Sequence, residues 1–188
     1  MRQPETDMIE RIFTATDQLM ANQGLANLSM HKIARQANIS PGTIYLYFKN
    51  KDELLHQFAQ DIFQRFQDTL RQNNDETLSF FERYRQMWWN VWHFLQANPS
   101  VLANIRQYES LPHFEKLCQE WEERSFWKQF CELAAEAGEL CDLPYNVLFL
   151  LGIKSAIEMA LKAKNYPEDF SVDLLESVIV RTWQAMKK

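Results

Sequence analysis

Apolar residues recur every three or four positions along almost the whole chain, and this repeat limits the possible folds more than any other feature. One example consists of Leu78, Phe81, Tyr84, Trp88, Trp92 and Leu95. Because an α-helix has about 3.6 residues per turn, this spacing places the apolar side chains on one face of a helix. Alternation of apolar and polar residues, the pattern of a half-buried strand, is rare. The sequence therefore predicts an all-α fold.

Turn-forming residues divide the helical pattern into segments. They lie at Asn22–Gly24, Asn38–Ser40, Asn50, Asn73–Asp75, Asn98–Pro99, Leu111–Pro112, Asp142–Pro144 and Asn165–Pro167. These breaks predict about nine helices. The sequence has no internal repeat, low-complexity tract or flexible linker, so we expect a continuous helix from Lys51 to about Leu70 to join two domains, residues 1–50 and residues 51–188.

Cysteine usage and the absence of long apolar segments exclude several classes of protein. No segment approaches the roughly 18 uncharged apolar residues of a membrane-spanning helix, and the N-terminal residues lack the apolar centre of a signal peptide. We therefore expect a cytoplasmic protein without membrane contact. Cys118, Cys131 and Cys141 form no CxxC pair, and His93 and His113 add no usual metal-ligand spacing. We expect reduced thiols, no metal and no cofactor.

The segment from Leu28 to Leu54 carries the start signals of three successive helices. Ser29 can cap a short helix that ends near Ala37, and after a tight turn Ser40 can cap a second one. Pro41 then occupies the first helical position, where its missing N–H costs nothing. A third helix has Asn50 as its cap, with an acid three residues later. Two short helices with a tight turn between them form a helix-turn-helix unit.

The second helix of this unit has two different sides. Ile44 and Phe48 project to one side, and we expect them to be buried against the preceding helices. Tyr45 lies near the edge of this side, so its ring can either pack inside or take part in binding. The opposite side is expected to face solvent, and it carries Gly42, Thr43 and Tyr47. Exposed hydroxyls beside a glycine suit contacts with DNA phosphates and thymine methyl groups.

Positive charge is concentrated in the same unit. Residues 24–51 carry a net charge of +4 and no acidic residue, whereas residues 1–23 carry −2 and residues 52–188 carry −7. The four basic residues are Lys32, Arg35, Lys49 and Lys51. On charge alone, they can equally well form a solvated surface. Together with the capped helix pair, they favour DNA binding.

The same segment resembles the N-terminal signature of TetR-family transcriptional regulators. The resemblance covers roughly residues 8–56 and rests on Gly24, Leu28, Ile33, Ala34, Ala37, Ile39 and the stretch SPGTIYLYFKNKDELL. It implies that residues 1–50 are a DNA-binding domain with a recognition helix from Pro41 to Phe48. It also implies that residues 51–188 form a helical ligand-binding and dimerisation domain, and that the partner is double-stranded palindromic operator DNA.

Residue roles follow from the resemblance position by position. Side chains at the places of Pro41, Gly42, Thr43 and Tyr45 approach bases or the groove wall in such proteins. Those at Tyr47 and Lys51 hold phosphates. His31 stands where other members can carry a base-reading arginine. The complete expected DNA-binding set is Ser29, His31, Ser40, Pro41, Gly42, Thr43, Tyr45, Tyr47, Lys49 and Lys51.

One short helix contacts few base pairs, so adequate affinity requires two copies of the protein. We therefore expect a homodimer that reads two half-sites about 34–36 Å apart. The last two predicted helices carry a small-residue stripe and an apolar stripe that suit a four-helix bundle across the two-fold axis. The expected interface comprises Gly152, Ser155, Ala156, Met159, Ala160, Leu175, Val178, Ile179, Thr182 and Trp183. The alternative is that these stripes are part of the core of a single chain.

Residues 76–140 are rich in aromatic side chains, which either pack as core or surround a small-molecule pocket. The candidate pocket residues are Trp88, Trp92, Arg106, Tyr108, Phe126, Trp127 and Phe130. Repression relieved by a small, largely apolar or aromatic effector is the function that the resemblance implies. The alternative is a ligand-independent or activating DNA-binding regulator.

Two other classes of function are less consistent with the sequence. An enzyme could use Glu136, Glu158 or His93 as an acid or base, but no nucleophile–base spacing or phosphate-binding loop accompanies them. A protein-interaction module would not need the positive charge of residues 24–51. We therefore expect no enzymatic activity.

Overall fold

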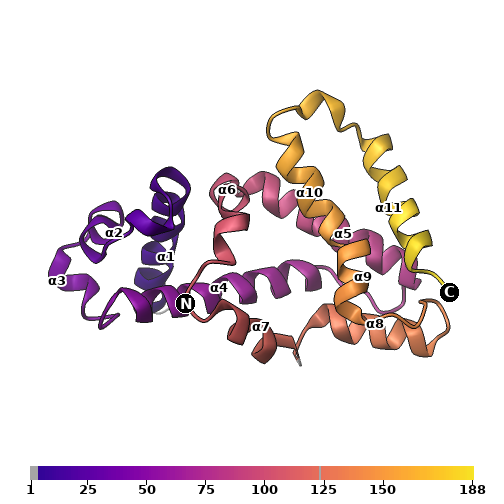
Figure 1. Cartoon of the computed structure of the whole chain (residues 1–188), viewed down its shortest axis with the longest axis horizontal. Helices are drawn as coiled ribbons and strands as arrows, with labels where there is room; N and C mark the ends of the chain where they lie inside the picture. The colour runs from indigo at the N-terminus through magenta and orange to yellow at the C-terminus, as the bar shows by residue number, and fades with distance from the viewer. Residues whose placement is uncertain (1–3, 123) are drawn as a thin grey trace. The chain divides into compact units, whose positions relative to one another are not determined.

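The computed structural model describes residues 4–122 and 124–188, and these residues form eleven α-helices and two short 3-10 helices (Figure 1). The elements in chain order are α1 (Pro4–Gln23), η1 (Leu25–Asn27), α2 (Met30–Gln36), α3 (Pro41–Ile44), α4 (Lys51–Arg71), α5 (Phe80–Ala97), α6 (Pro99–Tyr108), α7 (Phe114–Glu122), α8 (Phe126–Glu136), α9 (Tyr145–Leu151), α10 (Lys154–Ala163), η2 (Pro167–Asp169) and α11 (Val172–Met186). The predicted all-α fold is confirmed.

The count exceeds the expected nine helices because two of the predicted helices are each divided. One break separates α7 from α8, where Ser125 starts the second helix by accepting a hydrogen bond from the backbone N–H of Lys128. The other break lies at Gly152, between α9 and α10. Neither position carries the asparagine or proline that marks the other boundaries.

Packing divides the chain into two compact units. Unit 1 comprises residues 1–62 and 99–118, and unit 2 comprises residues 63–98 and 119–188. Helix α4 runs unbroken from Lys51 to Arg71 and belongs to both, which confirms the predicted continuous helix. The packing units are distinct from the functional boundary at residues 50 and 51, which remains a prediction.

In unit 1, a buried polar network joins α6 to α1. The Asp17 carboxylate accepts hydrogen bonds from the Tyr108 hydroxyl at 2.6 Å and from Asn104 Nδ2 at 2.9 Å. Asn104 Nδ2 also lies 2.7 Å from the carbonyl oxygen of Asp17, and its Oδ1 accepts from Gln107 Nε2 at 3.0 Å. Because Asp17, Asn104 and Tyr108 are all buried, these bonds fix the register of the two helices.

In unit 2, helix α5 supplies the aromatic centre of the core. A capping box between Ser79 and Glu82 starts the helix. Tyr84 is fully buried and its hydroxyl lies 2.6 Å from Thr182 Oγ1 on α11, and burial raises the pKa of this phenol. The Trp88 indole N–H donates to Ser155 Oγ on α10 at 2.7 Å. These bonds connect α5 to both C-terminal helices.

The small-residue stripe that was expected at a subunit interface lies inside unit 2. Gly152, Ala156 and Ala160 are buried, and a Cβ atom on Gly152 would come within 2.8 Å of Met186 Sδ and 3.1 Å of Tyr84 Cε2. Small residues therefore allow close packing within the chain. The same correction applies to the buried members of the α11 stripe, which are Leu175, Ile179 and Trp183. Ser155, Met159, Val178 and Thr182 are partly exposed.

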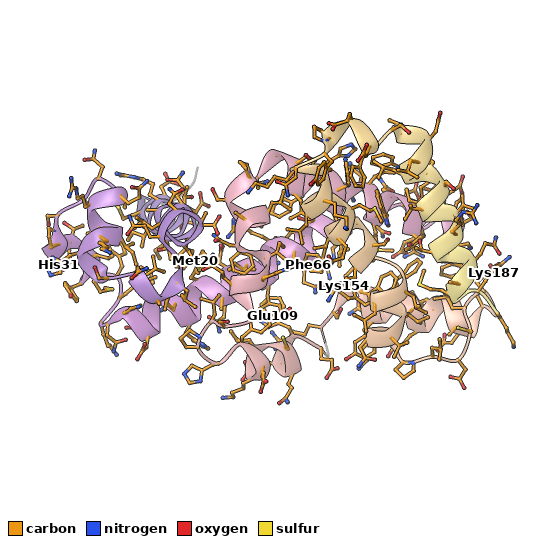
Figure 2. The ribbon with its side chains drawn as sticks, turned by 45° about the horizontal axis from the view of Figure 1, so that its top comes forward. Met20, His31, Phe66, Glu109, Lys154 and Lys187 are labelled. Carbon is orange, nitrogen blue, oxygen red and sulfur yellow. The ribbon has the colours of Figure 1, made fainter. Side chains whose placement is uncertain are left out.

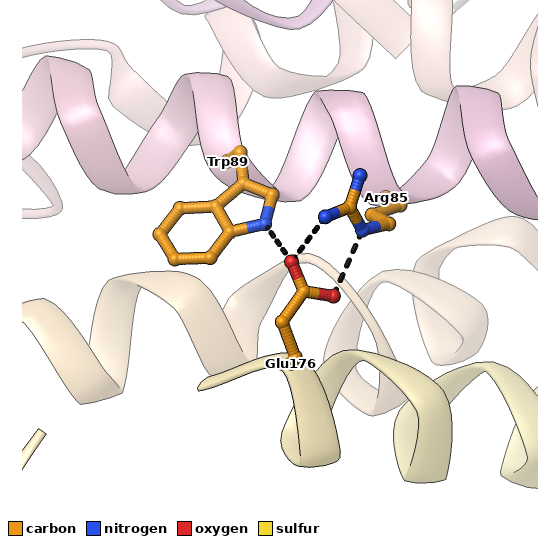
Figure 3. A network of polar contacts seen from close by, with 3 residues as sticks. All are labelled: Arg85, Trp89 and Glu176. Atoms are coloured by element: carbon orange, nitrogen blue, oxygen red, sulfur yellow. Dashed lines mark hydrogen bonds and ion pairs between the residues drawn. The ribbon is translucent and has the colours of Figure 1, made fainter. Parts of the chain in front are cut away.

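A polar cluster joins the surface of α5 to α11 (Figure 3). The Arg85 guanidinium and the Glu176 carboxylate form a bidentate ion pair, in which Arg85 Nε lies 2.8 Å from Glu176 Oε2. The Trp89 indole N–H donates to Glu176 Oε1 at 2.8 Å. The Arg85 hydrogen bond lowers the pKa of Glu176, and Trp89 adds to this effect.

Replacing Glu176 by glutamine tests the contribution of this cluster to stability. At neutral pH we expect Glu176→Gln to lower the free energy of unfolding by about 1 kcal/mol, the size of a well-formed surface ion pair. Because the carboxyl pKa is lower in the folded state, the stabilisation is present above the ordinary glutamate pKa and is lost as the pH falls below it. Urea unfolding at several pH values measures the difference, which should shrink below about pH 4.

The matched control is Glu136→Gln, which changes an exposed carboxylate on α8 and should leave stability within about 0.5 kcal/mol at every pH. A Glu176→Gln difference that is equally large at pH 3 and at pH 7 would contradict the assigned role of the ion pair.

Candidate nucleic-acid interface

Local hydrogen bonds build the turn between α2 and α3. Ser29 Oγ accepts from the Lys32 backbone N–H at 3.3 Å and caps α2 as expected. At the other end of α2, Asn38 adopts a positive φ of 55°, which asparagine tolerates better than most residues. Arg11 Nη2 on α1 donates to the Ala37 carbonyl oxygen at 2.8 Å. These contacts hold the turn against the first helix.

The recognition element is shorter as an α-helix than the predicted range Pro41–Phe48. Ser40 caps α3 through a 3.1 Å hydrogen bond from the Thr43 backbone N–H, and the α-helix ends at Ile44. The chain continues in tight turns, in which the N–H groups of Leu46 and Tyr47 donate to carbonyl oxygens three residues earlier. Phe48 N still donates to Ile44 O at 3.1 Å. The segment therefore remains compact up to Phe48.

The two sides of this element largely follow the prediction. Ile44 and Phe48 are buried, which is confirmed, and Phe48 contacts Phe13 of α1 with ring centroids 5.8 Å apart. Thr43 and Tyr47 are partly exposed. Tyr45 is 49% exposed, so its ring does not pack at the buried edge. At about 100° per residue Tyr45 lies between the buried and the exposed side, so periodicity alone did not decide its position.

Leu46 is a candidate DNA-contacting residue that the sequence analysis did not include. Its side chain is 82% exposed, more than any other large hydrophobic side chain in the described part of the chain. It lies between Tyr45 and Tyr47 in the turns that follow α3. An apolar side chain held out from the surface suits contact with a thymine methyl group. The signal in the sequence was its place on a helical wheel, about 160° from Ile44, but its apolar character suggested a core position.

A groove of about 610 Å³ lies beside the turn of the helix-turn-helix unit. It is lined by His31, Arg35, Asn38, Ile39, Ser40 and Pro41. Three residues of the predicted set therefore line one groove, with the exposed His31 side chain on α2 (Figure 2). Arg35, which entered the sequence analysis only through its charge, lines the same groove.

The basic residues of the unit differ in their accessibility. Lys32 Nζ is engaged within the chain, with Gln23 Oε1 at 3.2 Å and the Asn27 carbonyl oxygen at 2.9 Å. Arg35 and Lys49 are exposed and Lys51 is partly exposed. The backbone N–H of Lys49 donates to Glu53 Oε2 at 2.6 Å, which fixes the junction with α4. The positive charge available to a partner therefore comes mainly from Arg35, Lys49 and Lys51.

The seven candidate pocket residues are divided between the two units. Trp88, Trp92, Phe126, Trp127 and Phe130 are buried in unit 2, where Trp88 stacks on Trp92 and Trp127 stacks on Phe130. Arg106 is exposed on α6 in unit 1. Tyr108 is buried in unit 1, where its hydroxyl is bound to Asp17. The five residues of unit 2 are thus placed as core, and their contact with a ligand stays a prediction.

Two features, a metal-binding cluster and a membrane-spanning helix, are absent from the described residues. Within residues 4–122 and 124–188, no three His, Cys, Asp or Glu side chains are arranged to hold a metal ion. No helix of this part of the chain is both long enough and apolar enough to cross a membrane. Cys131 is buried, and burial raises the pKa of its thiol.

Comparison with known proteins extends the similarity over nearly the whole chain. Residues 12–58 match the family model for bacterial regulatory proteins of the tetR family, and residues 79–187 match the model for a tetracyclin repressor-like C-terminal domain. An uncharacterized HTH-type transcriptional regulator of Haemophilus influenzae is 53% identical over the full length of both chains.

Solved structures show the same relationship. The crystal structure of a TetR-family transcriptional regulator from Haemophilus influenzae has 52% identity, covers all of both chains and gives a TM-score of 0.94. FadR from Bacillus subtilis in complex with stearoyl-CoA is 18% identical, with a TM-score of 0.71 over 92% of this chain and 96% of that one, and shares the fold. On the family models and the full-length relative, the chain belongs to the TetR family of bacterial transcriptional regulators.

Proposed function

We propose that the protein is a sequence-specific repressor that binds palindromic operator DNA as a homodimer and is released by a small, largely apolar or aromatic effector. The observation that carries this proposal is the surface of the segment from Pro41 to Lys51. Leu46 and Tyr45 are exposed there, next to a groove that Arg35 lines. Ile44 and Phe48 are buried and anchor the segment to the core.

In this proposal the side chains of the unit divide between two tasks. Tyr45, Leu46 and Thr43 contact base edges and thymine methyl groups in the major groove, and so determine the sequence. Arg35, Lys49 and Lys51 contact phosphates, and so supply affinity that depends on salt but not on sequence. His31 lines the protein groove together with Arg35. In the proposed complex it contacts the wall of the DNA groove.

Two substitutions separate these tasks. We expect Leu46→Ala to weaken binding to the preferred operator by about tenfold and to leave binding to random DNA unchanged, because only a base contact is lost. Lys51→Ala should weaken binding to both and reduce the slope of log affinity against log salt by about one. Fluorescence anisotropy with both DNAs at several salt concentrations measures this. Equal effects of the two substitutions on both DNAs would refute the assigned roles.

The proposed dimer uses a different surface from the buried stripes. One side of α9 exposes Val147, Leu150 and Leu151, which follow each other at spacings of three and one residues, and Leu150 is 58% exposed. Val172, Leu174 and Val180 are exposed on α11. Apolar side chains that remain exposed on α9 and α11 suit a two-fold interface.

The charge-introducing substitution Leu150→Glu tests this surface. Burying an unpaired carboxylate in an apolar interface is costly, so we expect the variant to sediment as a monomer at about 10 μM, where the wild type sediments as a dimer. Leu46→Glu is the matched control, since it places the same charge on the most exposed leucine, outside the proposed interface, and should remain dimeric. A dimeric Leu150→Glu or a monomeric wild type would contradict the proposal.

The effector acts in this proposal by population shift. It binds a conformation whose two recognition segments have the wrong separation for the operator, which lowers DNA affinity by about 1–3 kcal/mol of coupling free energy. Support comes from the fold, since FadR of Bacillus subtilis was solved with stearoyl-CoA. An activator would use the same contacts at another operator position. The protein would work in the cytoplasm, where its DNA is.

A further inference from the structure

A buried hydroxyl group without a partner lies in unit 2. The Tyr145 hydroxyl, at the start of α9, has no hydrogen-bond partner within the described residues and is inaccessible to solvent. The rest of the Tyr145 side chain is partly exposed. A buried hydroxyl that makes no hydrogen bond costs about 1–3 kcal/mol, so such groups usually have a partner. The Tyr145 hydroxyl is therefore a donor that calls for a partner other than the described residues.

Aromatic rings from three helices surround α9 on the side of Tyr145. Phe149 lies one turn after Tyr145, and its ring centroid is 6.0 Å from that of Phe66 on α4 and 6.3 Å from that of Trp127 on α8. The Trp127 indole N–H donates to the Tyr145 carbonyl oxygen at 2.8 Å. We call Phe66, Trp127, Tyr145 and Phe149 the α9 aromatic cluster; Phe66 is marked in Figure 2.

The α9 aromatic cluster is accessible although its hydroxyl is not. Phe66, Tyr145 and Phe149 are each partly exposed, and only Trp127 is fully buried. Phe149 follows Tyr145 by four residues and therefore shares its side of the helix, whereas Leu150 and Val147 project from the other side. The cluster is thus separate from the proposed dimer surface.

A positive charge lies next to the hydroxyl-bearing ring. Lys128 Nζ on α8 is 5.7 Å from the centroid of the Tyr145 ring, which is within the range of a cation–π contact. The ammonium group makes a negatively charged oxygen the favoured acceptor for the Tyr145 hydroxyl. An aromatic surface, one hydroxyl donor and one nearby cation together fit an aromatic or apolar molecule with a single anionic group.

We propose that the α9 aromatic cluster binds the effector, and that the effector is an aromatic or apolar molecule whose carboxylate or sulfonate accepts a hydrogen bond from the Tyr145 hydroxyl. The inference rests on the proposed effector response and names the chemical class of the effector. Its body packs against Phe66 and Phe149, which lie on helices α4 and α9. Helix α4 also begins at the DNA-binding segment, so a ligand on Phe66 contacts the helix that carries the recognition unit.

A matched pair of fluorescent probes tests the proposal without DNA. The anion 1-anilinonaphthalene-8-sulfonate and the neutral N-phenyl-1-naphthylamine share their aromatic body and differ in the sulfonate. We expect the wild type to bind both saturably. Tyr145→Phe should weaken binding of the anilinonaphthalene sulfonate by about tenfold and leave binding of the neutral probe unchanged, because a hydrogen bond to a charged group is lost.

Two controls make the result specific. Tyr166→Phe removes a hydroxyl from a tyrosine that is 58% exposed in the same unit, and should change neither affinity. Thermal unfolding of Tyr145→Phe without probe should occur at the same or a higher temperature than that of the wild type, since a hydroxyl without a partner is removed. A lower unfolding temperature would show that the hydroxyl is satisfied within the protein, by a bound water molecule, and would overturn the proposal.

Other outcomes are equally decisive. The proposal is overturned if the wild type binds neither probe saturably, if Tyr145→Phe keeps full affinity for the sulfonate, or if it loses both probes equally. Operator binding is measured separately with the sulfonate present. If the sulfonate binds through Tyr145 but leaves operator affinity unchanged, the binding site stands and the proposed effector response fails.

Discussion

Gly42→Glu is expected to reduce operator affinity by at least about 100-fold while leaving the fold intact. Gly42 is exposed, and a Cβ atom there would meet only Ser40 Oγ at 3.7 Å, an ordinary contact distance. The side chain can therefore be added without strain. In the proposed complex this position faces the DNA backbone, where a carboxylate would meet phosphates at short range and would also lose its hydration. Fluorescence anisotropy with operator DNA and urea unfolding measure the two effects.

The control for this substitution is Ala135→Glu, which adds the same charge to an exposed position of α8 in unit 2. It should change operator affinity by less than about threefold, because screening at physiological salt limits the reach of a surface charge to about 8 Å. A Gly42→Glu protein that folds and still binds the operator normally would rule out the proposed orientation of α3.

Asn104→Leu is expected to lower the free energy of unfolding by about 3 kcal/mol, the largest stability effect among these substitutions. Leucine nearly preserves the volume but removes both hydrogen bonds to Asp17 and the acceptor for Gln107. The Asp17 carboxylate then keeps only the Tyr108 hydroxyl as a donor in this network. A buried carboxylate that loses a donor is costly. Urea unfolding at one fixed protein concentration measures the difference.

Two further variants calibrate this result. Tyr108→Phe removes one donor and should cost about 2 kcal/mol, less than Asn104→Leu. Asn165→Leu alters an exposed asparagine between α10 and η2 and should change stability by less than about 0.5 kcal/mol. If Asn104→Leu were as stable as the wild type, the polar network would not be what holds α6 against α1.

Features that depend on neighbouring residues could be predicted from the sequence. Ser29, Ser40 and Asn50 each act as the predicted cap, because a cap requires only a side-chain oxygen and an N–H group three residues later. Burial of Ile44 and Phe48 followed from one turn of helical periodicity. The all-α fold and the unbroken helix α4 followed from the same rule, applied over longer segments.

The surfaces could not be predicted in the same way, because periodicity identifies an apolar face without saying what covers it. Gly152 and Ala156 form such a face, and only the structure shows that α5 and α11 already cover it. The helical wheel places Leu46 opposite Ile44, but it does not say whether an exposed apolar side chain there serves a partner.

Contacts between residues that are distant in the sequence could not be predicted either. Asp17 and Asn104 are 87 residues apart, and neither has a local pattern that marks it as buried. For the same reason Tyr108 was assigned to a ligand pocket, although its hydroxyl is bound to Asp17. That the buried Tyr145 hydroxyl lacks a hydrogen-bond partner among the described residues can be known only from the positions of its neighbours.

Selection of bound sequences from a pool of random double-stranded DNA tests the central claim most directly, because it requires both the recognition surface and the dimer. The account predicts enrichment of a palindrome whose half-sites lie about one helical turn, or 34–36 Å, apart. In a parallel selection, Leu46→Ala should lose preference at symmetric positions within both half-sites. A wild-type selection that yields no common sequence, or a single half-site without symmetry, would contradict the account.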